Sequence, residues 1–104
     1  MSVLNGVLLE ELNRVRKNIN SYESLLSSLP KGCLIEQRIH GKAYCYRKRR
    51  EGSLVLSEYI GASESAEAKK AHEDYLERKR IEKNLRALKK EEARLVKALR
   101  HYGD

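Results

Sequence analysis

Two runs of apolar residues at heptad spacing constrain the fold of this chain more than any other feature of its sequence. The first run advances in alternating steps of four and three residues and comprises Leu8, Leu12, Val15, Ile19, Tyr22, Leu26 and Leu29. The second has the same spacing, with Glu92 at one position, and comprises Ile81, Leu85, Leu88, Leu95, Leu99 and Tyr102. Seams of this kind pack one helix against another, and they predict helices at about residues 2–28 and 64–102.

The segment between the seams has the pattern of a small sheet. Pro30 and Gly32 end the first helix, and Ser63 is the predicted N-cap of the second, with Glu64 and Glu67 in its first turn. Three strands are predicted at residues 34–39, 43–48 and 54–60. His40-Gly41 suits a two-residue hairpin turn, which pairs Ile39 with Lys42.

Together these elements predict an α+β fold in a single domain, residues 1–104. A long antiparallel, coiled-coil-like helical hairpin is expected, with a three-stranded antiparallel β-meander at about residues 33–61 inserted between its helices. Residues 78–102 pair with the first helix, so residues 64–77 remain to cover the sheet. A second apolar strip beside the seams would allow a homodimer through the helices, and it comprises Leu9, Leu25, Leu76, Ala87 and Val96.

The second turn decides which face of the sheet is buried. A two-residue loop at Glu51-Gly52 would put Leu54, Leu56 and Ile60 on the same face as Arg47 and Arg49. A three-residue loop, Arg50-Glu51-Gly52, separates the two kinds of residue, and we favour it for that reason. It predicts an apolar face of Cys33, Ile35, Ile39, Tyr44, Tyr46, Leu54, Leu56 and Ile60. The opposite face then carries Glu36, Arg38, Cys45, Arg47, Arg49, Val55, Ser57 and Tyr59.

Positive charge is concentrated in the sheet. The formal net charge of the chain is +7, and residues 31–50 contain seven Lys or Arg and one Glu. A local field of this size indicates a binding surface for an anionic partner. Edge lysines and arginines that keep sheets apart are the alternative explanation. The candidate nucleic-acid-binding residues are Arg38, Lys42, Arg47, Lys48, Arg49, Arg50 and Tyr59.

The sequence does not favour an enzyme. Its three histidines do not cluster, Cys33, His40 and Cys45 are too few for a closed zinc site, and no cofactor or metal is expected. The two cysteines are expected to be reduced and to lie on opposite faces of the sheet. No apolar run approaches the roughly 20 residues that span a bilayer, and no export signal is evident, so a cytoplasmic protein that does not bind membranes is expected.

Residues 32–72 carry a resemblance to a known family. The motifs are His-Gly-Lys-Ala-Tyr-Cys-Tyr from His40, Arg-Arg-Glu-Gly from Arg49 and Ser-Glu-Tyr-Ile-Gly from Ser57, followed by a helix rich in Ala, Glu and Lys. This stretch resembles the three-stranded arm-type DNA-binding domain of tyrosine recombinases and related mobile-element proteins. The resemblance implies that the sheet enters the major groove of DNA and that Arg38, Arg47 and Arg49 contact it. The catalytic recombinase domain has no counterpart in this chain, so recombination is not implied.

Two functions are therefore expected. The first is a small accessory or regulatory protein that binds nucleic acid, DNA rather than RNA, through the basic face of the sheet. The alternative is a protein-binding adaptor or inhibitor from a phage or mobile element, acting on a host nucleoprotein complex as anti-CRISPR proteins do.

Overall fold

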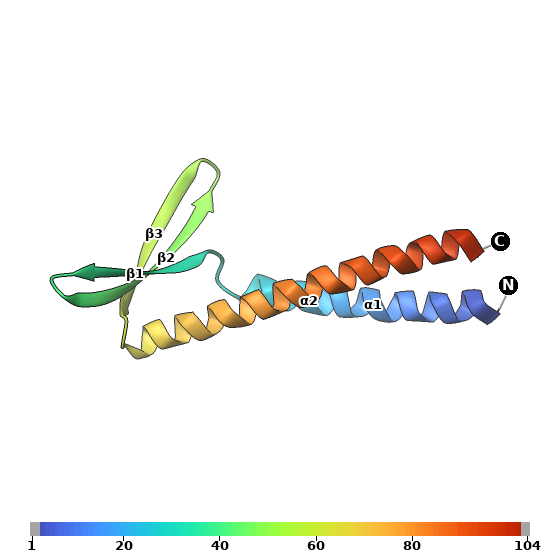
Figure 1. Cartoon of the computed structure of the whole chain (residues 1–104), viewed down its shortest axis with the longest axis horizontal. Coiled ribbons are helices and arrows are strands. Elements are labelled where there is room, and N and C mark those ends of the chain that lie inside the picture. Colours follow the sequence, from blue (N-terminus) through green and yellow to red (C-terminus); the bar gives the residue numbers. More distant parts are fainter. Residues whose placement is uncertain (1–2, 103–104) are drawn as a thin grey trace. The chain divides into compact units, whose positions relative to one another are not determined.

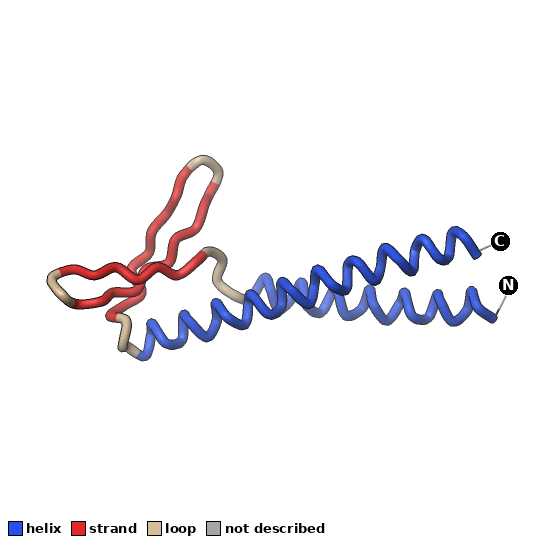
Figure 2. Tube along the Cα trace, in the orientation of Figure 1, coloured by secondary structure: helices blue, strands red, loops and turns tan. Residues whose placement is uncertain are grey.

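A computed structural model describes residues 3–102 and contains two helices and one sheet (Figure 1). The elements are α1 (Val3–Ser28), β1 (Cys33–Ile39), β2 (Lys42–Glu51), β3 (Leu54–Ala62) and α2 (Ala66–Tyr102). The three strands form one antiparallel sheet in the order β1-β2-β3 (Figure 2). The predicted α+β class, with long helices on either side of a β-meander in the sequence, is confirmed.

The chain divides into two compact units, and α2 contributes to both. Within the described residues, one unit consists of residues 3–28 and 80–102, and the other of residues 29–79. This division agrees with the prediction that residues 78–102 pair with the first helix and that residues 64–77 belong with the sheet. The two units are called the helical unit and the sheet unit below.

The helical unit is held together by the predicted seams. Its core cluster is formed by Val15, Ile19 and Leu85, with Tyr22, Leu26, Leu88 and Leu95 packed against it. Glu92, the charged residue in the second seam, forms an ion pair with Arg16 on α1 at 3.1 Å. An ion pair at that position replaces an apolar contact between the two helices, which explains why the seam tolerates a glutamate.

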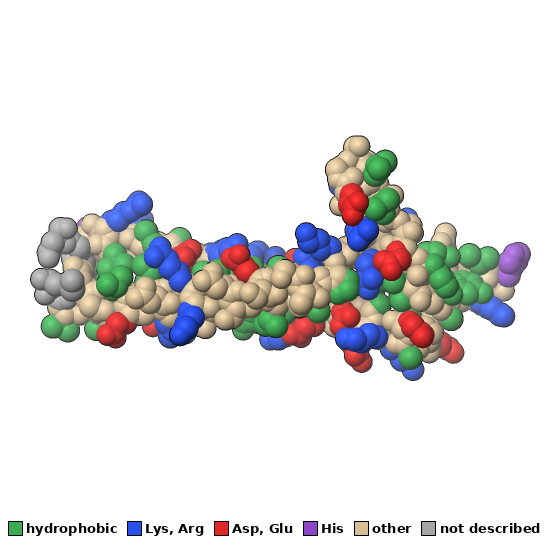
Figure 3. Space-filling model, turned by 180° about the vertical axis from the view of Figure 1, so that it is seen from behind, with side chains coloured by type: hydrophobic (Ala, Val, Ile, Leu, Met, Phe, Trp, Pro, Cys, Tyr) green, Lys and Arg blue, Asp and Glu red, His purple; other side chains and the backbone are tan. Residues whose placement is uncertain are grey.

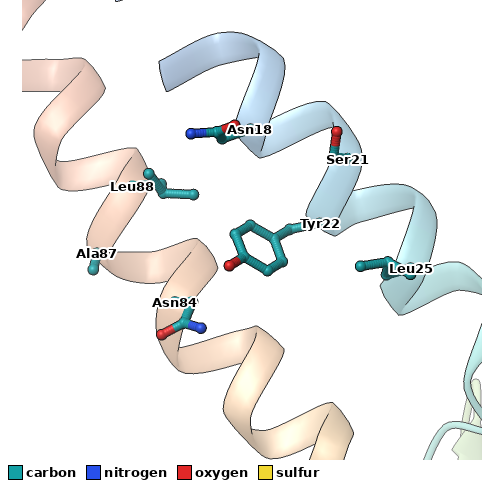
Figure 4. Close-up of a pocket in the computed structure, with 7 residues that line it drawn as sticks. All are labelled: Asn18, Ser21, Tyr22, Leu25, Asn84, Ala87 and Leu88. Atoms are coloured by element: carbon teal, nitrogen blue, oxygen red, sulfur yellow. The ribbon is translucent and has the colours of Figure 1, made fainter. Parts of the chain in front are cut away.

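A shallow groove lies between the helices of this unit (Figure 4). Tyr22 and Leu25 line it from α1, and Asn84, Ala87 and Leu88 line it from α2. Leu25 remains half exposed there, and Val3, Leu4, Val7 and Leu9 are also exposed on α1. The apolar residues of the helices are therefore only partly covered within one copy of the chain.

The first hairpin turn of the sheet follows the prediction. Ile39 pairs with Lys42 and Gln37 pairs with Tyr44, so His40-Gly41 is a two-residue turn. His40 has a φ of 52° and Gly41 a φ of 80°. Positive φ at both positions is the geometry of a type I′ turn, which matches the right-handed twist of the strands it joins.

The second turn differs from the prediction. Glu51 pairs with Leu54, so the turn is formed by Gly52-Ser53 and not by Arg50-Glu51-Gly52. Gly52 has a φ of 62°, as the first residue of a II′ turn requires. A bulge in the pairing near Cys45 and Tyr46 changes the register again further along β3. The predicted sorting into two faces is therefore correct for the residues of β1 and β2 and wrong for those of β3, where Leu54 and Leu56 exchange faces with Ser57 and Tyr59.

The start of α2 also differs from the prediction. Ser63 was the predicted N-cap, but α2 begins at Ala66, and the hydroxyl of Ser65 accepts a hydrogen bond from the backbone N–H of Ala68 at 3.1 Å. Ser65 is therefore the N-cap. Ser63 still belongs to the sheet, because its backbone N–H donates to the carbonyl of Ala43 at 3.0 Å.

One glycine is needed where the chain leaves the first helix. Gly32 has a φ of 107°, and a Cβ at this position would lie 2.3 Å from the carbonyl oxygen of Lys48. Only glycine allows β1 to begin this close to the backbone of β2. The side chain of Arg78 on α2 holds the same region in place, because it donates a hydrogen bond to the backbone carbonyl of Leu29 at 3.2 Å.

Candidate nucleic-acid interface

The two faces of the sheet are distinguished by the residues of β2. Successive side chains of a strand point to opposite faces, so Lys42, Tyr44, Tyr46, Lys48 and Arg50 share one face. Tyr59 of β3 pairs with Tyr46 and lies on the same face. We call the face of these six residues the open face. The opposite face, represented by Leu34, Cys45 and Arg47, is called the covered face.

Helix α2 packs over the covered face. Leu34 and Arg47 line a small recess together with Ala71, Asp74 and Tyr75 of α2. Cys45, Ala68 and Ala71 are buried, and the Arg47 side chain is only 15% exposed. The N-terminal turns of α2 therefore cover part of the face of the sheet that was predicted to be free and basic, around Cys45 and Arg47.

The predicted apolar core of the sheet is correspondingly wrong. Tyr44 and Tyr46 are on the open face and only partly buried. Cys33 is exposed, and Ile39, Leu54 and Leu56 are at least one-third exposed. Leu54 and Leu56 share the covered face with Arg47 and Arg49, because Glu51 pairs with Leu54 and Arg49 with Leu56. That is the mixture of charge and apolar residues that the three-residue loop was chosen to avoid.

Three tyrosines form a cluster on the open face. The Tyr59 ring lies 5.4 Å from the Tyr46 ring, edge to face, and 6.2 Å from the Tyr44 ring, measured between centroids. Together with Ile39 they line an open depression of about 350 Å³ formed by the sheet alone. Tyr59 is 55% exposed. Aromatic side chains thus come to the surface on the face of the sheet that lies opposite the N-terminal turns of α2.

The charges of the sheet are divided unequally between its faces. All three glutamates of the sheet lie on the covered face: Glu36 pairs with Cys45, Glu58 pairs with Arg47, and Glu51 follows two residues after Arg49. There Glu58 lies 3.5 Å from Arg47 and Glu51 lies 3.3 Å from Arg49, so each of these arginines has a carboxylate beside it. On the open face Lys42, Lys48 and Arg50 form no ion pair with any carboxylate in residues 3–102. The positive field of the sheet is therefore strongest on the open face.

The seven predicted site residues fall into two groups. Lys42, Lys48, Arg50 and Tyr59 come together on the open face. Arg38, Arg47 and Arg49 lie on the opposite side, where Arg47 is mostly buried and Arg49 is ion-paired. Arg38 is exposed and lines a recess with Lys42 and Tyr44 near the first turn. The predicted arginine triad is thus not one free surface.

Tyr44 and Tyr46 were not among the predicted site residues because they were assigned to the core of the sheet. One signal in the sequence could have found them, since Lys42, Tyr44, Tyr46, Lys48 and Arg50 alternate at a period of two along a single strand. A strand whose every second residue is basic or tyrosine has a face suited to an anionic, aromatic ligand. That pattern does not depend on the register of β3.

The end of the second hairpin extends beyond β1. β1 pairs only with residues 42–48 of β2, so Arg49 to Glu51 and Leu54 to Leu56 pair with each other alone. Leu54 and Val55 are about 60% exposed at this two-stranded end. In Figure 3 the end of the hairpin carries hydrophobic side chains, in green, at the surface of the molecule.

Other possible sites in the described chain have less to support them. A recess of about 530 Å³ between the covered face and α2 is lined by Cys45, Ser63, His72 and Glu73, among others. Across residues 3–102, no three His, Cys, Asp or Glu side chains are placed so that they could hold a metal ion. Both cysteines are free thiols, Cys33 exposed and Cys45 buried. Neither α1 nor α2, as far as it is described, has an apolar stretch able to cross a membrane.

Searches against protein-family models, curated proteins and solved structures found nothing that matches this chain. The resemblance to the arm-type domain of tyrosine recombinases therefore stays a prediction from the sequence.

Proposed function

We propose that this protein binds nucleic acid through the open face of its sheet. The observation that carries the proposal is the row Lys42, Tyr44, Tyr46, Lys48 and Arg50 on one uncovered face of β2, with Tyr59 beside it and no carboxylate on the same face. Cations without acidic neighbours attract phosphates, and aromatic rings between them offer surfaces to bases.

The arrangement of charge also supports a polyanion as the ligand. The core of an ordinary protein–protein interface is depleted of charged residues, lysine among them. Here the sheet's acids are confined to the covered face, where Glu58 and Glu51 pair with Arg47 and Arg49. The three basic residues of the open face are spread along about 27 Å of strand, because Lys42 and Arg50 are eight residues apart. A ligand with repeated negative charges fits such a row better than a single anion does.

The test is a comparison of two double variants with equal charge change. Lys48→Glu with Arg50→Glu alters the open face, and Arg38→Glu with Arg49→Glu alters the opposite side of the same strands. Binding is measured by fluorescence anisotropy with labelled DNA and RNA oligonucleotides at several salt concentrations. We expect the open-face variant to lose on the order of 100-fold in affinity at low salt and the matched variant to lose far less.

Two outcomes would contradict the proposal. One is the absence of salt-dependent binding to every oligonucleotide by the unaltered protein. The other is an equal loss in the two double variants, because that would mean that only net charge matters and not the face that carries it.

The exposed end of the second hairpin favours a second candidate, a protein-binding adaptor or inhibitor. Leu54, Val55 and Leu56 lie exposed on a two-stranded end, and exposed apolar residues that cluster often mark a protein contact. A partner that is retained after nuclease treatment and lost on Leu54→Ser with Val55→Ser would support this function. A partner that is released by nuclease would support nucleic acid instead.

A further inference from the structure

We infer that the ligand of the open face is single-stranded nucleic acid, whose bases stack on the tyrosine cluster. This inference rests on the proposed function and narrows it to one class of ligand. It replaces the duplex DNA predicted from the sequence, because that prediction depended on Arg38, Arg47 and Arg49 forming one free surface.

The tyrosine cluster has the geometry of a stacking platform. Tyr59 is held by ring contacts to both Tyr44 and Tyr46, at 6.2 Å and 5.4 Å between centroids, yet more than half of its surface remains exposed. The two ring contacts orient Tyr59, and its exposed surface is available to a ligand. A flat, exposed and oriented ring on a sheet is what a nucleobase needs for stacking.

A duplex is less suited to these rings than a single strand is. In double-stranded nucleic acid the flat faces of the bases are stacked on each other, and only their edges are accessible in the grooves. Base edges are read by hydrogen-bonding side chains, chiefly Arg, Lys, Asn and Gln. The centre of the open face instead presents Tyr44, Tyr46 and Tyr59, beside the apolar Ile39. Single strands can turn their bases outward onto such rings.

Lysines flank the cluster at both ends along β2. Lys42 precedes Tyr44 by two residues, and Lys48 follows Tyr46 by two residues, so the four side chains span about 20 Å of strand. Both lysines are exposed. A backbone that passes over the tyrosines would meet a cation before and after them, which suits a site of about two or three bases.

The test compares the affinity for single-stranded and for duplex oligonucleotides, in protein with and without an aromatic ring at residue 59. The probes are fluorescein-labelled single strands of about 12 nucleotides, as oligothymidylate and oligouridylate, and a blunt DNA duplex of the same length. The protein variants are Tyr59→Leu, which keeps an apolar side chain, and Tyr59→Phe, which keeps the ring. Tyrosine fluorescence is a second readout, because the chain has six tyrosines and no tryptophan.

We expect the single strands to bind more tightly than the duplex. Tyr59→Leu should weaken single-strand binding by about 5- to 150-fold, the loss that follows from removing one stacking partner, while Tyr59→Phe, which keeps the ring, should lose much less. Circular dichroism checks that both variants remain folded. A preference for oligothymidylate or for oligouridylate distinguishes DNA from RNA as the source of the strand.

The outcomes that overturn this inference differ from those that overturn the proposed function. If the duplex binds as tightly as the single strands, or if Tyr59→Leu binds as the unaltered protein does, stacking is excluded while nucleic-acid binding stands. If no probe binds and tyrosine fluorescence does not change, both proposals fail.

Discussion

The two faces of the sheet carry similar numbers of basic residues but differ in what surrounds them. On the covered face Arg47 is mostly buried beneath α2, and both Arg47 and Arg49 lie beside glutamates. On the open face Lys42, Lys48 and Arg50 have tyrosines as their neighbours along β2. The same residue type is therefore structural on one face and available to a ligand on the other. Neighbours and coverage, and not the number of arginines, determine which face can bind.

The largest effect expected from this comparison is on stability. Cys45 is 9% exposed on the covered face, whereas Cys33 is exposed on the open face. Cys45→Asp would bury a carboxylate among Leu34, Ala68 and other neighbours, and should lower the free energy of unfolding by about 3 kcal/mol. Cys33→Asp makes the same chemical change and should stay within about 0.5 kcal/mol of the unaltered protein. Urea denaturation followed by circular dichroism measures both, and equal losses would mean that α2 does not cover the face we describe.

A second, intermediate effect is expected in thiol reactivity. Under native conditions an alkylating reagent should modify Cys33 quickly and Cys45 at least about tenfold more slowly, since a buried thiol reacts only when the sheet opens. Mass spectrometry of the digested protein locates the modified residue over time. In urea both thiols should react at the same rate. Rapid native modification of Cys45 would contradict its burial by α2.

The smallest effect concerns the ion pair of Lys70 with Asp74, a residue that lines the recess above the covered face. Lys70 donates a hydrogen bond to the Asp74 carboxylate at 2.8 Å, and this bond, together with the attraction between the charges, raises the Lys70 pKa above its ordinary value of 10.5. A lysine whose pKa is higher in the folded than in the unfolded protein stabilises the folded state. This contribution is complete below pH 10.5 and is lost as the pH rises through the folded-state pKa.

Lys70→Gln should therefore lower Tm by a few degrees at most near neutral pH, and the difference should shrink in strong alkali. Lys69→Gln is the matched control, because no ion pair of Lys69 with a carboxylate is found in residues 3–102. Thermal denaturation of the two variants across pH makes the comparison. Identical Tm values for both variants at neutral pH would show that the pair contributes nothing.

Much of the fold could be predicted because its signals are local and repeated. The heptad seams predict both helices, and Pro30 and His40-Gly41 correctly mark the end of α1 and the first turn. The second turn could not be predicted in the same way. Arg50-Glu51-Gly52-Ser53 allows several loops around one glycine, and each choice moves Leu54 and Leu56 to a different position relative to β2.

The candidate site depended on that second turn. The prediction assumed that the apolar residues of the sheet must share one buried face, but the end of the β2–β3 hairpin leaves Leu54 and Val55 exposed. The prediction also assumed that Tyr44 and Tyr46 belong to the buried core of the sheet. In a chain this small, α2 covers only part of one face with short side chains such as Ala68 and Ala71, and the tyrosines remain on the other.

The most direct test of the central claim, that the open face is the nucleic-acid interface, is an NMR titration of the protein with a short single-stranded oligonucleotide. We expect progressive shifts of the ring signals of Tyr44, Tyr46 and Tyr59 and of the amide signals of Lys42, Lys48 and Arg50. The signals of Leu34, Cys45 and Ala71, on or against the covered face, should stay in place. Shifts confined to the helical unit, or centred on Arg38 and Arg49 with the tyrosine rings unmoved, would contradict it.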